Sequence, residues 1–396
     1  MPQPTPFHSR TSALCQSHEW RDWAGWLAAS TYEHSHDREY YAIRNAVALI
    51  DVSPLFKYEV RGPDAVRLVN RVMTRDISKC RLGRVMYTPW CDDDGKMIED
   101  GTVARLAEEH LRVTAAERSL RWFEDCGYGL KATVEETTQE LAALAVQGPN
   151  SRALLQELMP QAGLEKLGYF RLTQTRIDGF DVTVTRTGYT GDLGYELWTP
   201  AKNASRLWDI LMERGYGYGA APTGIVALDI ARIEAGLLLI DVDFFSSFKT
   251  LIEAQQSSPL ELGLGWAVRF DKGDYVGRQA LLNEREKGSE WALMGVEVDW
   301  THLERLFGAV GLPPRVAGRA SRSALPLYKE GEQIGQVTSH TFSPILKKYI
   351  GLASLQSRQA RPGNRVEMEV TIEYARQRVR ATLVKTPFFD PKRKRE

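Results

Sequence analysis

Residues 57–73 read KYEVRGPDAVRLVNRVM, a short β-rich run followed by Gly-Pro, an aspartate and a helical pattern. Residues 141–159 read LAALAVQGPNSRALLQELM and repeat that order, with Gly148 standing 86 positions after Gly62. Proline suits the first turn of a helix, where its missing N–H would have no partner in any case. Two copies are too few for a solenoid, so they predict two related α+β modules, unless the likeness is the coincidence of a common turn.

Two β-hairpins are predicted next to these units. The acidic turn DDDG at 92–95 joins two extended runs within residues 83–113. Further on, apolar and polar residues alternate over 181–186, GYTGDLGY turns the chain, and residues 195–198 resume an extended run. Alternation of this kind is typical of half-buried strands. Both modules are therefore expected to contain antiparallel strands.

Helical patterns follow the second hairpin, over residues 203–214 and 223–235. Gly215 closes the first and Gly236 the second. A helix commonly ends in a left-handed residue, and glycine adopts that conformation without steric cost. We expect both glycines to be left-handed helix caps.

The C-terminal third changes to short strands separated by Gly and Pro turns. From about Leu293 onward these runs are ALMGVEV, EQIGQVTSH, RVEMEVTI and RVRATLV. Such a pattern predicts an all-β domain, either a sandwich or a barrel. The charged end DPKRKRE at 390–396 is expected to be a frayed terminus.

Size and composition limit the class of protein. The chain has 396 residues, so a prior of about 150 residues per domain predicts two or three domains. Hydrophobic residues make up 43% and charged residues 26%, which are ordinary values for a globular protein. Basic and acidic residues number 51 each, so no net field attracts nucleic acid or an anionic membrane. We expect neither as a partner.

The cysteines and the N-terminus bear on the cellular compartment. None of Cys15, Cys80, Cys91 and Cys126 belongs to a CxxC pair, so we expect reduced thiols and no zinc site. The first thirty residues lack the apolar segment of a secretory signal. No run approaches the ~18 consecutive apolar residues of a membrane-spanning helix. The expected location is the cytoplasm.

Common catalytic motifs are missing from the sequence. There is no GxxxxGK[ST] loop, and the glycines at 215–220 follow a helix instead of a strand, so a nucleotide site has no support. No G-x-S-x-G elbow is present, which argues against a serine hydrolase. The seven histidines show no ligand spacing, and no metal site is predicted.

Carboxylates that stand beside aromatic residues are the remaining candidates for chemistry. Each alone is compatible with ordinary packing, because strand tyrosines are amphipathic and an arginine can pair with an aspartate at i,i+3. Together they suit a flat heteroaromatic ligand, with rings on its faces, a carboxylate at its N–H edge and an arginine for a remote carboxylate. The residue pattern leaves both interpretations open. The candidates are Tyr87, Glu99 and Asp100; Tyr189, Tyr195 and Glu196; and Asp229, Arg232 and Glu234.

Six motifs in order resemble the aminomethyltransferase (glycine cleavage T-protein) superfamily of folate-dependent one-carbon transferases. The resemblance runs from about residue 40 to 385, nearly the whole chain. Six ordered motifs are far harder to match by chance than one short pattern. They are RGPDAVRLVNRVMTRDISK, LAVQGPNS, TRTGYTGDLGYEL, ARIEAGL, GDYVGRQAL and GQVTSHTFSPILKKYIGLA.

The resemblance implies an α+β fold, a cloverleaf of three domains around a central folate channel. Residues 1–50 plus 140–245 would form the first α+β domain. Residues 51–139 would form a second, inserted in the first, and both would contain antiparallel sheets. Residues 246–289 would connect them to a C-terminal β-barrel-like domain at 290–396.

The resemblance also implies roles for single residues, with tetrahydrofolate as the cofactor. Glu196 corresponds to the carboxylate that grips the pterin ring, and Tyr189 lies against the cofactor in the same motif. Asp100 corresponds to the acid that faces the reactive folate nitrogens N5 and N10, and it is the expected catalytic residue. The further expected cofactor contacts are Tyr87, Thr102 and Arg232, the last near the cofactor's outer portion.

The chemistry of those roles is consistent. Pterin offers a 2-amino group and a ring N–H side by side, and the two oxygens of Glu196 can accept both. Leaving such donors unpaired in a buried site costs about 1–3 kcal/mol each. When N5 attacks a one-carbon unit it gains positive charge, which an ionised Asp100 would stabilise or relieve by accepting the departing proton.

Departures from the glycine cleavage proteins bear on the donor. Glu99 stands where those proteins have a second aspartate, and Trp90 where they favour a softer run. Phe248 lies in an aromatic segment where they have a shorter, acidic one. In this the chain looks more like folate-dependent demethylases and the folate domains of dimethylglycine-type oxidases. Trp90, Glu99 and Phe248 are therefore the candidate donor contacts.

Three functions stay open at this point. The first is transfer of an aminomethyl group from a lipoyl carrier protein to tetrahydrofolate. The second is transfer of a methyl group from a small methylated oxygen, sulfur or nitrogen compound to the same acceptor. The third is a folate-binding protein without transferase chemistry that assists iron–sulfur assembly. Asp274 argues against the third, because that branch of the superfamily has a cysteine in the matching motif.

Overall fold

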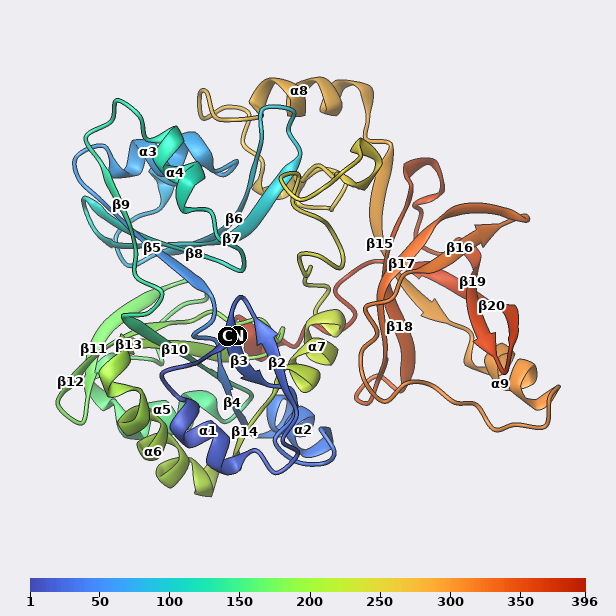
Figure 1. Cartoon of the computed structure of the whole chain (residues 1–396), viewed down its shortest axis with the longest axis horizontal. Helices are drawn as coiled ribbons and strands as arrows, with labels where there is room; N and C mark the ends of the chain where they lie inside the picture. Colours follow the sequence, from blue (N-terminus) through green and yellow to red (C-terminus); the bar gives the residue numbers. More distant parts are fainter.

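The computed structural model describes all 396 residues. Its strands form a six-stranded sheet, a five-stranded sheet, a closed barrel and a small N-terminal sheet. Figure 1 shows the two larger sheets one above the other, with the barrel beside them. The expected α+β fold with a C-terminal β-barrel is confirmed.

The six-stranded sheet is built around the strand of the second Gly-Pro unit. All its neighbouring strands are antiparallel except the pair β4 and β14. In spatial order they are β11 (Leu172–Ile177), β12 (Phe180–Thr185), β13 (Gly194–Pro200), β10 (Leu141–Gln147), β4 (Val47–Asp51) and β14 (Ala220–Pro222). The predicted hairpin around GYTGDLGY is confirmed as β12 and β13.

Helices cover both faces of this sheet (Figure 1). Leu144 and Val146 of β10 pack against α5 (Ser151–Leu158) and α6 (Ala204–Gly215). Ala143 and Ala145 between them face α2 (Asp37–Asn45) and α7 (Ile225–Glu234). A strand buried on both faces has no polar face, so β10 is an almost continuous apolar run.

The five-stranded sheet contains the first Gly-Pro unit and is antiparallel throughout. Its strands in spatial order are β6 (Val85–Cys91), β7 (Met97–Ala107), β8 (His110–Ala115), β5 (Phe56–Arg61) and β9 (Thr133–Glu136). The predicted acidic turn joins β6 to β7. On one face α3 (Ala65–Val72) and α4 (Leu120–Cys126) close a hydrophobic core. Within it Leu68, Val69 and Val72 are fully buried, as the predicted helix face requires.

The two Gly-Pro units have the same local geometry. Gly62 has a φ of 119° and Gly148 a φ of 121°. A Cβ on Gly62 would lie 2.5 Å from the carbonyl oxygen of Lys131, and one on Gly148 would lie 2.5 Å from that of Ala46. Only glycine tolerates both the conformation and the close approach, which explains why each strand-to-helix turn begins with it.

The C-terminal strands close into a barrel. In order around it they are β15 (Trp291–Val298), β18 (Lys348–Gln356), β17 (Glu332–Ser343), β16 (Leu325–Lys329), β19 (Arg365–Ile372) and β20 (Ala375–Val384). Two of them, β16 and β18, were not among the strands expected from the sequence. Residues 349–353 of β18 are buried in succession, so this strand lacks the alternation that marks a half-buried strand.

The N-terminal residues pack on the six-stranded sheet. A small sheet forms from β1 (Gln3–Pro4), β3 (Trp26–Ala29) and β2 (Trp20–Trp23). Phe7, just before α1 (His8–Leu14), is fully buried, and its ring centroid lies 6.0 Å from that of Trp208. The N-terminus is thus part of the core around α6.

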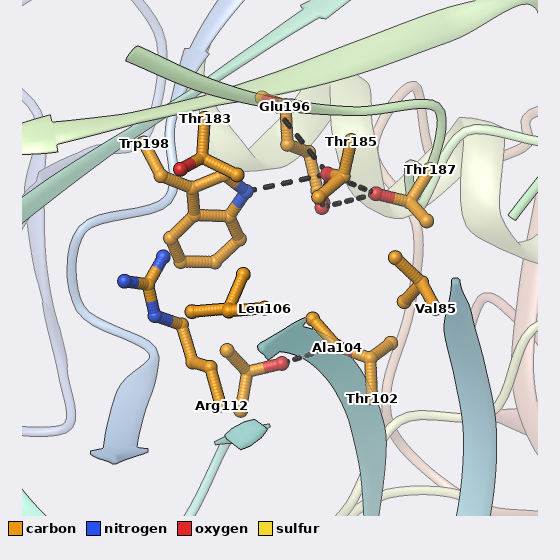
Figure 2. A pocket seen from close by; sticks show the side chains of 11 residues that line it. Val85, Thr102, Ala104, Leu106, Arg112, Thr183, Thr185, Thr187, Glu196 and Trp198 are labelled. Carbon is orange, nitrogen blue, oxygen red and sulfur yellow. Dashed lines mark hydrogen bonds between the residues drawn. The ribbon is translucent and has the colours of Figure 1, made fainter. Parts of the chain in front are cut away.

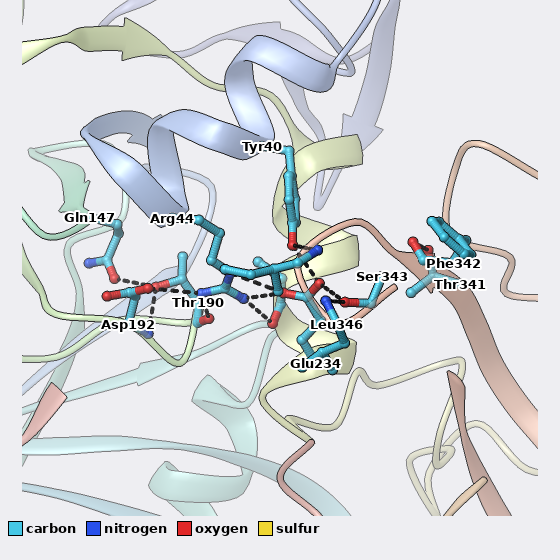
Figure 3. A network of polar contacts seen from close by, with 12 residues as sticks. Tyr40, Arg44, Gln147, Thr190, Asp192, Glu234, Thr341, Phe342, Ser343 and Leu346 are labelled. Carbon is cyan, nitrogen blue, oxygen red and sulfur yellow. Dashed lines mark hydrogen bonds and ion pairs between the residues drawn. The ribbon is translucent and has the colours of Figure 1, made fainter. Parts of the chain in front are cut away.

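A buried polar network, here called the junction, joins segments that are far apart in the sequence (Figure 3). The carboxylate of Glu234 accepts hydrogen bonds from the Tyr40 hydroxyl at 2.6 Å, from Arg44 Nη2 at 2.6 Å and from Ser343 Oγ at 2.5 Å. Arg44 also pairs with Asp192, and both side chains are fully buried. The junction therefore connects α2, α7, the loop before β13 and the barrel strand β17.

The C-terminal tail is ordered, so the expectation of a frayed terminus is wrong. Arg393 donates through Nε and Nη2 to the two carboxylate oxygens of Asp192, at 2.6 and 2.8 Å. Arg152 Nη2 donates to the carbonyl oxygen of Glu396 at 2.8 Å. A buried carboxylate needs charged partners, and the tail supplies one to Asp192, which the residue pattern of the tail alone does not reveal.

One of the two predicted helix caps is also wrong. Gly215 has a φ of −69°, and the chain continues through a 3-10 turn to Gly219, which is left-handed. A Cβ on Gly215 would lie 2.5 Å from that of Ala220, so this glycine allows the close approach of β14 instead. Gly236, with a φ of 65°, is the left-handed cap that was expected.

Two further helices are α8 (Arg278–Lys287), in the connection to the barrel, and α9 (Trp300–Gly308), against the barrel. None of the nine α-helices combines the length and the apolar character that crossing a membrane requires. We propose that the domain boundaries follow the sheets, with residues 1–50 plus 140–245, 51–139 and 290–396 as three domains and 246–289 as their connection.

Candidate functional site

A cavity lies between the facing strands of the two larger sheets. The space inside it, with the adjoining open solvent included, is about 290 Å³. Strands β12 and β13 of the six-stranded sheet line one side, and β6, β7 and β8 of the five-stranded sheet line the other (Figure 2). The two related modules thus enclose one space. The lining residues that matter below are Val85, Thr102, Thr185, Thr187, Glu196 and Trp198.

Glu196 is the one carboxylate that lines this cavity. Its Oε2 accepts hydrogen bonds from Thr187 Oγ1 at 2.5 Å and from Thr185 Oγ1 at 3.3 Å. Thr185 pairs with Glu196 across β12 and β13, so both side chains stand on the cavity face. Oε1 has no hydrogen bond within the protein, and the Glu196 side chain lines the cavity (Figure 2).

Besides threonines and apolar side chains, the cavity around Glu196 contains Arg112, which pairs with Glu59 at 2.7 Å. Burial raises the pKa of the Glu196 carboxyl above its ordinary value, and the hydrogen bonds from Thr187 and Thr185 oppose that rise. No arginine or lysine pairs with this carboxylate. A carboxylate in such a place gains much from a ligand that brings N–H donors.

The loop that precedes Glu196, between β12 and β13, is held by Gln147 at the end of β10. Gln147 Nε2 donates to the carbonyl oxygens of Thr187 at 3.2 Å and Tyr195 at 3.1 Å, one at each end of the loop. A Cβ on Gly188 or on Gly194 would lie 2.1 or 2.2 Å from the Gln147 amide oxygen. The two glycines therefore make room for the side chain that fixes this loop.

Asp100 and Tyr87 form a second polar pair on the facing sheet. The Tyr87 hydroxyl donates to Asp100 Oδ2 at 2.6 Å. Tyr87 is the cross-strand partner of Thr102, and Thr102 lies two residues after Asp100 on the same face of β7. Burial raises the pKa of Asp100, whereas the hydrogen bond from Tyr87 lowers it. A carboxyl group with a raised pKa accepts a proton more readily than an ordinary aspartate does.

Glu99 lies behind Asp100, on the other side of the sheet. It is fully buried, and its two oxygens accept from the backbone N–H groups of Asp100 at 3.0 Å and Glu117 at 2.8 Å. Burial, with the neighbouring charge of Asp100, raises the pKa of Glu99 well above its ordinary value. The two adjacent carboxyl groups therefore disfavour being ionised together.

Tyr189 and Arg232 lie next to this pair. The Tyr189 hydroxyl donates to the carbonyl oxygen of Leu238. Burial raises the pKa of Tyr189, and the nearby charges of Arg232 and Asp100 also act on it. Arg232 is fully buried and pairs with Asp229 through Nε at 2.8 Å and with Asp243 through Nη1. Its Nη2 is buried without a hydrogen-bond partner.

The residues expected to contact the donor are less closely grouped. Trp90 is fully buried in the core of the five-stranded sheet, 5.9 Å from Phe123 between ring centroids, and it faces away from Tyr87. Phe248 is 59% exposed and packs edge-on against Trp122, with centroids 5.3 Å apart. The geometry offers support for Phe248 as a surface contact, and none for Trp90.

Several cavity residues were missed from the sequence. The hydroxyl row of Thr183, Thr185 and Thr187 reads there as an ordinary alternating strand. Trp198 lies on the same face of β13 as Glu196, and its Nε1 donates to Thr185 Oγ1 at 3.2 Å. Residues two apart in a strand lie on the same face, so the position of Trp198 two residues after Glu196 could have identified it.

Metal ligands are not grouped in this structure. No set of three or more His, Cys, Asp or Glu side chains is arranged to hold a metal ion. All four cysteines are free thiols, and Cys15, Cys80 and Cys91 are buried.

Comparison with known proteins gives a consistent match along the chain. The family model described as the GCVT N-terminal domain matches residues 9–272, and that of the glycine cleavage T-protein C-terminal barrel domain matches residues 309–390. An aminomethyltransferase of Halothermothrix orenii is 34% identical over 371 residues, which are 92% of this chain and 94% of that protein. An aminomethyltransferase of Thermotoga neapolitana is 34% identical over 99% of both chains.

Two other similarities differ in kind. A trimethylamine-oxide aldolase of Ruegeria pomeroyi is also 34% identical and covers 100% of this chain, but the match covers 48% of that protein. A crystal structure of glycine cleavage system aminomethyltransferase T from Bartonella henselae has a TM-score of 0.82 over 98% of this chain and 99% of that one. At 23% sequence identity this second likeness is one of fold.

Proposed function

The chain belongs to the glycine cleavage T-protein family of aminomethyltransferases, and from this premise we propose that it transfers a one-carbon unit to tetrahydrofolate in the cavity between its two larger sheets. It is an enzyme of the folate-dependent transferase type. The observation that carries the proposal is Glu196, a half-buried carboxylate with one oxygen free of hydrogen bonds, in a cavity that Thr102 lines from the opposite sheet.

The residues of the cavity fit a pterin ring. Glu196 Oε1 is free, and Oε2 accepts from threonine hydroxyls that can rotate, so the carboxylate can take the paired N–H donors of pterin. The indole of Trp198 and the side chain of Val85 supply apolar surface for a flat ring. The unpartnered Nη2 of Arg232 can take a carboxylate of the outer portion.

Tetrahydrofolate supplies N5 and N10 as acceptors of the one-carbon unit. Asp100 accepts or returns the proton that leaves the attacking nitrogen. Tyr87 holds the Asp100 carboxylate through a hydrogen bond of 2.6 Å, which keeps the acceptor oxygen in place. Glu99, the buried neighbour of Asp100, resists ionising beside it and so leaves the negative charge on Asp100. The facing sheets exclude water, which protects a reactive one-carbon unit from hydrolysis.

For the donor, the first candidate is an aminomethyl group on the lipoyl arm of a carrier protein. Support comes from the relatives named aminomethyltransferase, which match over nearly their whole length. The expectation of a cytoplasmic enzyme with reduced thiols agrees with that reaction and stays a prediction.

The second candidate donor is a small methylated compound. The trimethylamine-oxide aldolase that matches the whole of this chain supports a different chemistry at the same fold. The exposed Phe248 packs against the half-buried Trp122, and the next residue, Lys249, pairs with Glu117, whose backbone N–H donates to Glu99. A small methylated cation would suit such an aromatic surface next to a carboxylate.

The decisive experiment has two stages. Calorimetry with tetrahydrofolate should give saturable binding, and its absence would exclude the cofactor and with it the proposed function. Tetrahydrofolate is then supplied with aminomethylated lipoyl carrier protein or with a panel of methylated amines and sulfonium compounds. Formation of methylene-tetrahydrofolate with the carrier supports the first donor, whereas methyl- or methylene-tetrahydrofolate with a small compound supports the second.

A further inference from the structure

The loop between β12 and β13, residues 186–193, depends on contacts from outside to keep one conformation. It contains Tyr189 and leads into the strand that carries Glu196. Glycine occupies positions 188, 191 and 194, and Gly191 has a φ of 72°. Glycine loses more conformational freedom on folding than any other residue. Whatever fixes this loop therefore also fixes two of the expected cofactor contacts.

Asp192 anchors the loop, although it does not line the cavity itself. Its Oδ1 accepts from the backbone N–H of Leu193 at 2.8 Å, just before the first residue of β13. Arg393 donates to the same oxygen through Nε at 2.6 Å and to Oδ2 through Nη2 at 2.8 Å. Arg44 Nη1 lies 3.3 Å from Oδ2 (Figure 3). The bidentate pair with Arg393 is thus the shorter of the two ion pairs of Asp192.

The end of the chain contacts this loop at other points as well. Arg186, the first residue of the loop, donates through Nη2 to the carbonyl oxygen of Lys394 at 3.2 Å. Near the middle of the loop, a Cβ on Gly191 would lie 3.8 Å from the carbonyl oxygen of Phe389. Residues 389–394 therefore lie along the loop from its start to Asp192.

Arg393 can be removed without opening the hydrophobic core. Its side chain is 38% exposed, whereas that of Asp192 is fully buried. Lys392 and Arg395 on either side are exposed too. Without the Arg393 guanidinium, Asp192 would keep Arg44 as a cationic partner, so the fold should survive. The main loss would be the contact that fixes the Asp192 carboxylate from the side of the C-terminal tail.

We propose that Arg393 is a positioning residue for the tetrahydrofolate site, which acts through Asp192 to hold the 186–193 loop where Glu196 and Tyr189 can bind the ligand. This inference rests on the proposed function, because the loop is expected to contact the cofactor. Arg393 does not line the cavity. Its guanidinium fits both carboxylate oxygens at once, which fixes direction as well as distance. The pair would thereby set the fraction of molecules that are ready to bind.

The test is calorimetry with tetrahydrofolate on the wild-type protein and on Arg393→Ala. Without the bidentate pair the loop would populate conformations that do not bind, and the apparent affinity falls with the competent fraction. We expect the dissociation constant to rise about 5- to 20-fold at unchanged stoichiometry. A purely structural role would lower the stoichiometry, through loss of folded protein, and leave the affinity of the remainder unchanged.

A conservative variant and hydrogen exchange sharpen the test. Arg393→Lys keeps a positive charge beside Asp192 but cannot bridge both oxygens, so it should recover part of the affinity. In Arg393→Ala the amide protons of residues 186–193 should exchange faster, because the Leu193 N–H is bound by the Asp192 carboxylate. Exchange in the barrel strands should not change.

Arg10 provides a matched control. It forms the same kind of bidentate pair, with Nε 2.7 Å and Nη2 2.8 Å from the two carboxylate oxygens of Asp209 in α6, and its side chain is 43% exposed. Neither residue of this pair lines the cavity. Arg10→Ala should therefore keep the wild-type affinity for tetrahydrofolate. Thermal unfolding of all variants reports any loss of stability.

The remaining outcomes would overturn the inference. Unchanged affinity in Arg393→Ala, with or without a lower stoichiometry, would do so and leave the proposed function standing. An equal loss of affinity in Arg10→Ala would also contradict it, because general destabilisation would then explain both variants. If the wild-type protein does not bind tetrahydrofolate, the proposed function fails and this inference fails with it.

Discussion

The junction contains a buried glutamate and the cavity a half-buried one, and their carboxylates are hydrogen-bonded in different ways. In the junction both oxygens of Glu234 are occupied, by Tyr40 and Ser343 on one side and by Arg44 on the other (Figure 3). In the cavity one oxygen of Glu196 is held by two threonine hydroxyls, and the other is free (Figure 2).

This difference separates a structural role from a binding role. A buried charge with all its partners present cannot take a ligand without losing one of them, so Glu234 serves to join α2, α7 and the barrel. Glu196 has acceptor capacity left and forms no ion pair, so it carries a desolvation cost that a ligand can relieve. Substitutions should therefore affect stability at the junction and affinity or rate at the cavity.

The largest effect is expected for Asp100→Asn. The amide keeps the size of the side chain but cannot accept a proton, so kcat should fall by about 10²- to 10⁴-fold with tetrahydrofolate affinity retained. Single-turnover transfer and calorimetry on the same preparation measure the two quantities. A variant with full turnover would move the catalytic role to another residue.

At the junction, Glu234→Ala should lower the free energy of unfolding by about 3–5 kcal/mol, because it leaves Arg44 buried with one fewer acid. Urea unfolding measures this value. The matched cavity variant Glu196→Ala should lose about 1 kcal/mol or less, since only hydrogen bonds to hydroxyls disappear. Similar losses in both variants would contradict the distinction between the two regions.

For ligand binding the order should be reversed. Glu196→Ala removes the acceptor of two pterin donors, and a buried donor left unpaired costs about 1–3 kcal/mol. The affinity for tetrahydrofolate should therefore fall by roughly 10- to 100-fold. Calorimetry gives the dissociation constant. Glu196→Gln is a useful second variant, because its amide offers one acceptor and should give an intermediate loss. Unchanged affinity in both would retire Glu196 as the pterin contact.

The smallest effect concerns pH and Glu99. Its pKa is raised in the folded state, so the stability that the protonated form contributes is complete below the unfolded pKa near 4.5 and is lost as pH rises toward the folded value. Glu99→Gln cannot ionise, so its stability relative to the wild type should increase between pH 5 and pH 8, by about 1 kcal/mol or more. Thermal melts across this range test it, and a constant difference would show that Glu99 is already ionised.

Some of the fold could be predicted from local patterns. The two Gly-Pro turns require glycine for steric reasons, and the helices after them have apolar faces, so both units could be identified from residues 57–73 and 141–159 alone. The strand β18 could not, because a strand buried on both faces loses the alternation that identifies it. The prediction that Gly215 is a left-handed cap was wrong. The sequence does not distinguish a glycine needed for close packing from one needed for a left-handed conformation.

Among the candidate site residues, too, the sequence revealed those with a distinctive local pattern and missed those whose role depends on distant contacts. Asp100, Tyr87 and Glu196 stood out as carboxylates and tyrosines in strand patterns with a family resemblance. The threonines that hold Glu196 did not, since hydroxyls are common in strands and acquire a role only from what they face.

By itself, the sequence determined the two strand–turn–helix modules, the C-terminal all-β region and the kind of side chains available for binding, because propensity, periodicity and steric limits act over a few residues. Only the tertiary structure decided which face of each sheet encloses the cavity and which glutamate keeps a free oxygen. Those properties depend on contacts between segments such as β7 and β13, or Arg44 and Glu234, whose distance in the sequence leaves no local trace.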